Sequence, residues 1–178
     1  MSINTISASY LEMQVEMHKN PGYGVASLSF APMIATIVKS AGISSISDYG
    51  AGKMNLLKGL KEFGITDIDY RPYDPVFPNY GRPLPADLVC CIDVLEHIEY
   101  DFLDKVLQEL FDITTDVGFF SIHTGPAKKF LSDGRNAHLI QQPASWWLVK
   151  ICNFFEVIQM QRHEYSGEGF WIIVERKP

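Results

Sequence analysis

The sequence predicts an α/β fold, a doubly wound and mostly parallel sheet with an antiparallel hairpin at its C-terminal end. Short apolar runs that fit strands alternate with longer stretches of helical periodicity, as in βαβ units. The run 86–92 is almost wholly apolar, which is typical of a parallel strand buried on both faces. Two apolar runs near the end of the chain flank turn residues at 166–169, and this arrangement predicts the hairpin.

The expected elements alternate along the chain. Apolar residues at helical spacing predict helices over 5–19, about 30–41, about 56–63, 102–111 and 144–154. Pro32 suits the first turn of the second helix, and Gly42 suits its end. Apolar runs predict strands over 43–48, 68–74, 86–92, 117–123, 155–160 and 170–175. The segment 75–85 is too short and too rich in proline for a helix followed by a strand.

Composition indicates a single globular domain. The chain has 178 residues, of which 47% are apolar and 20% charged. Because it has no apolar run of membrane-spanning length and no signal-peptide pattern, we expect no membrane association and a cytoplasmic location. The three cysteines lie in apolar segments without metal-ligand spacing, so we expect buried thiols and no metal site. The net charge of −6 and the scattered basic residues argue against a nucleic-acid partner. The oligomeric state stays open.

A glycine turn between the first expected strand and the following helix is the most informative local feature. Gly50 and Gly52 follow Asp48, which ends the strand. Glycine adopts positive φ easily and lets a ligand approach the backbone where a Cβ would obstruct it. A carboxylate beside this turn suits an ammonium or a hydroxyl group rather than a phosphate. The pattern therefore predicts a binding site for a nucleoside-type ligand.

Two further strands end in acids. Asp74 ends the second expected strand, where a carboxylate can accept hydrogen bonds from both hydroxyls of a ribose. Asp93 ends the apolar strand and is followed by the sequence Val94-Leu95-Glu96-His97. Since ligands of open α/β sheets bind beyond the carboxyl ends of the strands, we expect these acids to line one site.

These segments resemble motifs of the class I S-adenosylmethionine (SAM) dependent methyltransferases. Asp48–Gly52 resembles the family's Asp-x-Gly-x-Gly turn, although many members have a third glycine where this chain has Met54. The segment 93–97 resembles the family's Asp-x-Leu-Glu-His turn. A small, poorly characterised bacterial and phage group of these enzymes is similar to the chain at 23–24, 48–50, 73–75, 93–97, 133–139 and 143–147.

The resemblance implies a Rossmann-like methyltransferase fold and SAM as the cofactor. It divides the chain into a helical N-terminal extension, 1–22, and a methyltransferase domain, 23–178. The cofactor-binding residues that it implies are Asp48, Tyr49, Gly50, Ala51, Gly52, Asp74, Pro75, Asp93 and Val94. Because 75–85 leaves no room for the family's third strand, which normally contacts adenine, we expect that strand to be missing and adenine to be held loosely.

The acceptor side of the site is expected in the long connection 124–142. Histidine titrates near neutral pH, so His138, His97 and His123 are the candidate general bases. Arg135 and Asn136 accompany His138 and are candidate substrate-binding residues, as is Trp146 on the following helix. Each also has a purely structural interpretation: the loop residues can fix the shape of the loop, and the tryptophan can belong to the core.

Several functions remain compatible with the sequence. The favoured one is transfer of a methyl group from SAM to a hydroxyl or amine of a small-molecule acceptor. A lyase or hydrolase that cleaves SAM is the alternative. A nucleic-acid methyltransferase and a nicotinamide-dependent dehydrogenase are weaker alternatives, the latter because Gly50, Gly52 and Asp74 partly match a dinucleotide-binding pattern that has a third glycine where this chain has Asn55.

Overall fold

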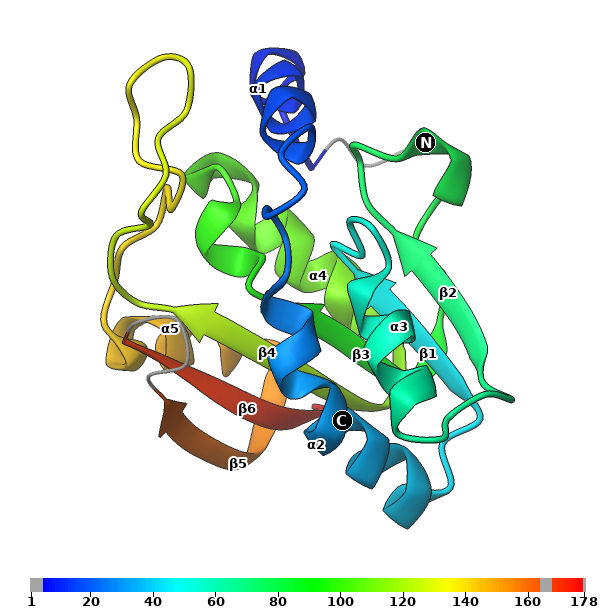
Figure 1. The fold of residues 1–178 in the computed structure, drawn as a ribbon. Coiled ribbons are helices and arrows are strands. Elements are labelled where there is room, and N and C mark those ends of the chain that lie inside the picture. Colours follow the sequence, from blue (N-terminus) through cyan, green and yellow to red (C-terminus); the bar gives the residue numbers. More distant parts are fainter. Residues whose placement is uncertain (1–4, 164–167, 178) are drawn as a thin grey trace.

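A computed structural model describes residues 5–163 and 168–177 and contains one sheet with the strand order β2-β1-β3-β4-β6-β5 (Figure 1). Its strands are β1 (Ser45–Tyr49), β2 (Asp69–Tyr73), β3 (Ala86–Ile92), β4 (Thr114–His123), β5 (Phe155–His163) and β6 (Gly169–Arg176). The strands β1 to β4 pair in parallel, whereas β6 runs antiparallel to both β4 and β5. The predicted mostly parallel sheet with a C-terminal antiparallel hairpin is confirmed. Of the expected hairpin turn, 166–167 lie outside the described residues.

Helices cover both faces of this sheet. They are α1 (Ala8–His18), α2 (Ala26–Ala41), α3 (Asn55–Glu62), α4 (Leu103–Ile113) and α5 (Ala144–Ile151), with the 3-10 turns η1 (Pro78–Tyr80), η2 (Leu95–His97) and η3 (Tyr100–Phe102). In Figure 1, α2 and α3 lie in front of the sheet and α4 behind it. None of the helices in the described part of the chain has the length and apolar character that a membrane span requires.

The predicted start of the second helix was wrong. The helix begins at Ala26, so that Pro32 lies inside it rather than in its first turn. Phe30 and Ala31 are buried together with Ile34, and the burial of their apolar surface stabilises the additional turn despite the missing N–H of proline. The end of the helix at Gly42 agrees with the prediction.

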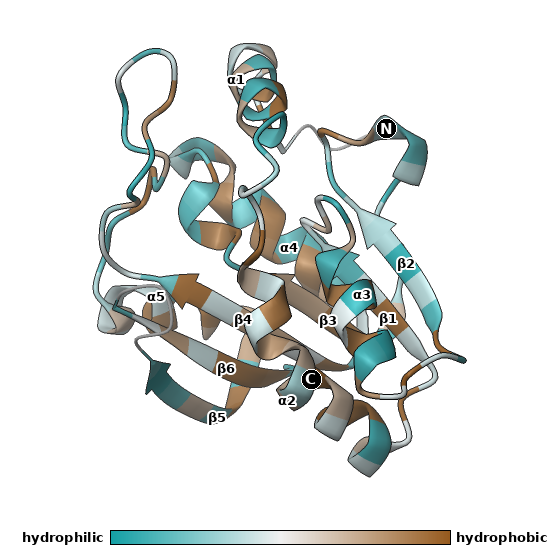
Figure 2. Cartoon of the chain, in the orientation of Figure 1, coloured by the Kyte–Doolittle hydropathy of each residue, from teal (hydrophilic) through white to brown (hydrophobic). Residues whose placement is uncertain are grey.

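Two apolar cores, one on each face, follow from the alternation of side chains along the strands. Cys90 packs with the core under α2 and α3, whereas the next residue, Cys91, packs with the core under α4 and α5. Figure 2 shows brown, hydrophobic residues along the central strand β3, and teal, hydrophilic residues at the end of the edge strand β5. The doubly wound arrangement is confirmed by this division.

The expected absence of the family's third strand is also confirmed. Between β2 and β3, residues 74–85 are all described and contain only the short turn η1, so β2 is the edge of the sheet. The rings of Phe77 and Tyr80 stack in this segment with centroids 5.3 Å apart. The Tyr80 hydroxyl donates a hydrogen bond to the carbonyl of Gly52 at 2.9 Å, which ties the segment to the glycine turn.

Candidate active site

A cavity of about 870 Å³ lies at the carboxyl ends of β1 to β4, where the sequence places the site. All the cofactor-binding residues expected from the sequence, and the three candidate bases, line it: Asp48, Tyr49, Gly50, Ala51, Gly52, Asp74, Pro75, Asp93, Val94, His97, His123 and His138. The volume falls within the range of small-molecule sites. Residues from distant parts of the sequence therefore meet at this edge of the sheet.

The glycine turn is compact and fixed to the neighbouring strand. Gly50 has a φ of 82°, and a Cβ at this residue would lie 2.4 Å from Cγ2 of Val94, so only glycine fits. The N–H groups of Gly50 and Ala51 both donate to the carbonyl oxygen of Tyr73, at 2.8 and 2.9 Å. The end of β1 is thereby held against the end of β2.

Met54 occupies a backbone conformation that favours glycine. Its φ is 54° and its ψ is 41°, at the residue that precedes α3. A side chain in this left-handed region costs about 1–2 kcal/mol relative to ordinary helical backbone. The position is the one where the methyltransferase motif often has its third glycine. At this position the turn therefore holds a non-glycine residue in a conformation that glycine adopts most easily.

Asp74 connects β2 to the glycine turn. One carboxylate oxygen accepts the N–H of Gly52 at 3.0 Å, and the other accepts the N–H of Val76 at 2.8 Å. Burial raises the pKa of Asp74, and the hydrogen bond from Val76 and the neighbouring His18 oppose that shift. Each oxygen still has a second lone pair with which to accept a hydroxyl group of a ligand.

Asp48 is buried at the end of β1 and is paired with a residue that the sequence analysis missed. The hydroxyl of Tyr70, on β2, donates a hydrogen bond to its carboxylate. Burial raises the pKa of Asp48 to about 7, and the hydrogen bond from Tyr70 opposes this. The carboxyl group therefore titrates near neutral pH, in contact with the cavity.

The three candidate bases form a cluster of imidazole rings. His97 comes from η2, His123 from the end of β4, and His138 from the loop before α5. The ring of His138 lies 4.8 Å from that of His97 and 4.6 Å from that of His123, measured between centroids. Convergence from three separate elements indicates a built site rather than a chance surface grouping.

Backbone carbonyls fix the tautomers of two of these rings. Nδ1 of His97 lies 2.8 Å from the carbonyl oxygen of Ala137, and Nδ1 of His138 lies 2.8 Å from that of Gly125. Because a carbonyl only accepts hydrogen bonds, each Nδ1 carries the proton and each Nε2 keeps its lone pair. Burial lowers the pKa of His97 to about 4 and also lowers the pKa of His138. Both rings are neutral at physiological pH.

Glu96 organises the strand ends behind this cluster, a role that the sequence did not reveal. Its carboxylate accepts the backbone N–H of His123 at 2.7 Å, and its carbonyl accepts the N–H of Ile140 at 3.0 Å. Burial, reinforced by the nearby Asp93, raises the pKa of Glu96 well above its usual range. Asp93 itself has a φ of 59°, a strained conformation of the kind that concentrates at functional sites.

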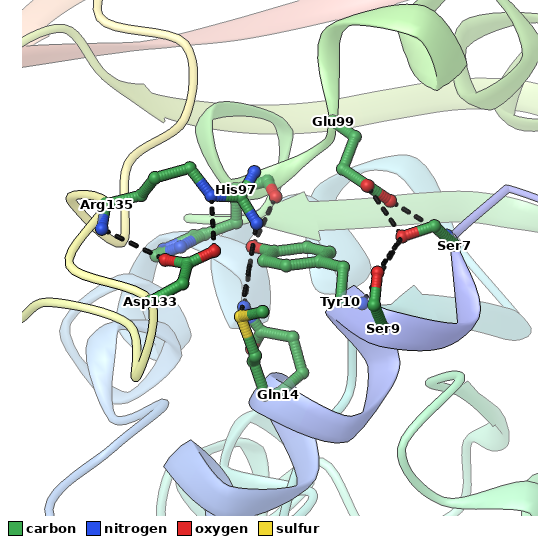
Figure 3. Close-up of polar contacts among 9 residues, drawn as sticks. Ser7, Ser9, Tyr10, Gln14, His97, Glu99, Asp133 and Arg135 are labelled. Carbon is green, nitrogen blue, oxygen red and sulfur yellow. Dashed lines mark hydrogen bonds and ion pairs between the residues drawn. The ribbon is translucent and has the colours of Figure 1, made fainter.

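The N-terminal helix α1 forms part of the cavity wall, and this was not expected from the sequence. In Figure 3, Tyr10 points toward His97, and its hydroxyl donates to the carbonyl of His97 at 2.7 Å. Gln14 donates to that hydroxyl at 2.6 Å, and the N–H of Ser7 donates to Glu99 at 2.8 Å. The signal in the sequence is the spacing of Tyr10, Gln14 and His18, which lie on one helical face. All three line the cavity.

The described wall of the cavity does not include the three candidate substrate-binding residues. Arg135 forms an exposed ion pair with Asp133 at 2.7 Å (Figure 3). The side chain of Asn136 bonds the N–H and carbonyl of Ala127, both at 2.9 Å, and thus fixes the loop. Trp146 lies on α5 and packs against the core under α4 and α5. In the structure these three side chains therefore lie outside the described cavity wall, and a role in substrate binding stays a prediction.

Comparison with known proteins rests on structure, because no protein-family model and no curated protein matches the sequence. The chain resembles a Burkholderia thailandensis 1,6-didemethyltoxoflavin-N1-methyltransferase, with a TM-score of 0.62 and 14% identity over 97% of this chain and 92% of the other. The chain has the fold of the class I SAM-dependent methyltransferases. A SAM-dependent methyltransferase of Clostridium acetobutylicum shares the methyltransferase fold, with a TM-score of 0.60 and 12% identity over 96% and 100% of the two chains.

Other solved structures show the same likeness to methyltransferases. The N-methyltransferase NodS of Bradyrhizobium japonicum, solved with S-adenosylhomocysteine, gives a TM-score of 0.58 and 7% identity over 97% of this chain and 100% of the other. Against a longer protein of Nostoc punctiforme the TM-score is 0.60 at 12% identity over 91% of this chain, which spans only 59% of that protein. These likenesses establish the methyltransferase fold.

Proposed function

We propose that the protein is a SAM-dependent methyltransferase that acts on a hydroxyl or amine of a small-molecule acceptor. The observation that carries this proposal is the meeting of the glycine turn, Asp74 and three imidazoles around a cavity at the carboxyl ends of the strands. The structural neighbours support it, because the Burkholderia enzyme was solved with 1,6-didemethyltoxoflavin and S-adenosylhomocysteine together.

The residues present fit SAM. The glycine turn brings the backbone of Gly50 and Gly52 to the cavity wall, and the carboxylate of Asp74 retains lone pairs for ribose hydroxyls. Asp48, at the start of the same turn, suits the ammonium group of the amino-acid end. Pro75, in the segment that replaces the third strand, and Val94 both line the cavity, and we place adenine beside them. When bound, SAM supplies an electrophilic methyl group attached to its sulfonium sulfur.

His138 is the general base in this proposal. Its Nε2 lone pair is available because Nδ1–H is held by the carbonyl of Gly125. The lowered pKa keeps the ring neutral at physiological pH, so it can accept the proton that a hydroxyl or amine loses. His97 is a poorer base, since burial lowers its pKa to about 4, and its contact with His138 helps to hold that ring in place.

The size of the cavity, about 870 Å³, fits a small acceptor. Tyr10 and Gln14 of α1 form part of its wall, and Lys128 and Lys129 line it from the loop after β4. Within the described residues neither lysine forms an ion pair, so either can face a negative group on the acceptor. The net charge of −6 argues against a polyanionic acceptor such as nucleic acid.

Incubation with SAM carrying a labelled methyl group, together with a mixture of cellular metabolites, tests the proposal. We expect label in a small-molecule product and stoichiometric formation of S-adenosylhomocysteine. Consumption of SAM without a methylated product would indicate cofactor cleavage instead. Stabilisation by NAD and not by SAM in a thermal-shift assay would contradict the cofactor assignment.

A further inference from the structure

His18 lies at the C-terminal end of α1, against the glycine turn. A Cβ at Gly52 would lie 3.5 Å from Cε1 of the imidazole, which puts the ring in contact with the turn. His18 is also close enough to Asp74 for each group to influence the pKa of the other. The imidazole, which comes from a helix outside the sheet, thus lies near the carboxylate to which we assign the ribose.

The nitrogen Nδ1 of His18 is buried and has no hydrogen-bond partner among the described residues. Nδ1 of His97 and Nδ1 of His138, by contrast, each bond a backbone carbonyl. A buried polar atom without a partner is costly, so its presence in a cavity wall calls for an explanation. A ligand that completes the hydrogen bond supplies one.

Aromatic contacts hold the ring of His18 in this position. Tyr23 lies 5.0 Å away and Phe77 lies 5.4 Å away, measured between ring centroids, and both contacts are edge-to-face. Phe77 belongs to the segment that replaces the missing third strand. The N-terminal helix and this segment therefore meet at His18.

The charges at this place select the kind of ligand. Burial lowers the pKa of His18, and the carboxylate of Asp74 only partly opposes this. The carboxylate of Asp74 repels phosphate, and together with the neutral imidazole it offers hydrogen-bond acceptors to a pair of hydroxyl groups. The vicinal diol of a ribose has that pair of donors.

We propose that His18 is a further cofactor-binding residue, which shares the ribose diol with Asp74. One hydroxyl donates to the carboxylate and the other to Nδ1 of His18. This inference rests on the proposed function, and it gives α1 a direct contact with the cofactor. Cofactor binding then stabilises α1 in the position where Tyr10 and Gln14 close the acceptor side.

Calorimetry with S-adenosylhomocysteine tests the assignment without relying on catalysis. His18→Phe keeps an aromatic ring between Tyr23 and Phe77 and removes both nitrogens. We expect its affinity to fall about three- to tenfold, the range for loss of one hydrogen bond. His18→Asn, whose amide reaches the place of Nδ1, should recover part of the loss. Glu16→Gln, on the exposed side of the same helix, is the matched control and should bind as the wild type does.

Ribose analogues of S-adenosylhomocysteine give the second readout. The wild type should bind both the 2′-deoxy and the 3′-deoxy compound more weakly than the parent. In His18→Phe, one of these two penalties should disappear, because the hydroxyl concerned has already lost its partner. Equal or tighter binding of the parent compound by His18→Phe, or unchanged penalties for both analogues, would overturn the role of His18 alone. Failure of the wild type to bind S-adenosylhomocysteine would overturn the proposed function as well.

Discussion

The imidazole of His138 lies edge-to-face against that of His97, with an interplanar angle of 84° and centroids 4.8 Å apart. Each ring is anchored through Nδ1 to a carbonyl of the loop that follows β4, His97 to Ala137 and His138 to Gly125. The loop after β4 and the turn η2 therefore hold each other in position. This mutual arrangement leaves the Nε2 lone pair of His138 as the acceptor for a proton.

Replacement of that base should separate turnover from cofactor binding. His138→Gln removes the imidazole while keeping a polar side chain, so turnover should fall about a hundredfold or more. Affinity for S-adenosylhomocysteine and the melting temperature should stay close to the wild type. His163→Gln is the matched control, because that histidine lies outside the described wall of the cavity. Full turnover in His138→Gln would exclude the catalytic role.

The pH dependence of stability should report the buried Asp48. Its folded-state pKa of about 7 lies above the ordinary value of 3.8, so the folded protein holds this proton more tightly than the unfolded chain does. The resulting stabilisation is present at low pH and is lost as the pH rises from about 4 to 7. Each pKa unit corresponds to ~1.4 kcal/mol.

Asp48→Asn removes this titration and keeps an acceptor for the Tyr70 hydroxyl. In urea denaturation without ligand, the variant should therefore gain stability relative to the wild type on going from pH 5 to pH 8. An identical pH profile for the two proteins would show that Asp48 does not carry the raised pKa.

A glycine at position 54 should relieve the backbone strain of the left-handed conformation. Met54→Gly relieves a left-handed backbone cost of about 1–2 kcal/mol and adds an unfolded-state entropy cost of about 0.5–1 kcal/mol. We expect a net gain of roughly 0.5 kcal/mol in the free energy of unfolding. Gly52→Ala, whose φ is 49°, is the reverse substitution and should destabilise the protein by about 1 kcal/mol. Changes of the opposite sign, measured by urea denaturation, would contradict the strain argument.

Replacement of Asn136 should reduce stability and turnover more than replacement of its neighbour Arg135. Asn136→Ala leaves the N–H and carbonyl of Ala127 without their partner and should cost about 1–3 kcal/mol. It should also reduce turnover, because the same side chain accepts the N–H of His138. Arg135→Ala breaks an exposed ion pair and should change stability by less than about 1 kcal/mol. Equal effects on turnover would show that the loop does not position His138.

The sequence predicted those parts of the site that lie on regular elements. Asp48, Asp74 and Asp93 end or directly follow parallel strands, and the geometry of such a sheet alone brings them together. The missing third strand was predictable because the segment between Asp74 and Ala86 is too short, and too rich in proline, for a helix followed by a strand. The predicted start of α2 was wrong because the packing of Phe30 and Ala31, a tertiary effect, outweighs the preference of Pro32 for the first turn of a helix.

The contributions of loops and of α1 were harder to predict. The polar side of α1 gives no indication of which surface it meets, so Tyr10, Gln14 and His18 were not assigned to the site. In the loop before α5, the residue types of Arg135, Asn136 and His138 all suited catalysis. Only the loop's hydrogen bonds separate His138, which lines the cavity, from Asn136, which holds backbone groups. A sequence pattern gives the type and spacing of residues. It does not give the partner of each hydrogen bond, because that partner can lie far away in the sequence.

Asp74 binds the cofactor at the glycine turn in the proposed function. Calorimetry of SAM binding to the wild type, to Asp74→Ala and to Asp69→Ala tests this role most directly. Asp69 lies on the same strand and is exposed, so its variant should bind SAM as the wild type does. Asp74→Ala should lose at least one charge-assisted hydrogen bond of about 1.5–3 kcal/mol, which lowers affinity tenfold or more. Unchanged affinity in Asp74→Ala would contradict the role of Asp74, and a wild type that does not bind SAM would contradict the cofactor assignment itself.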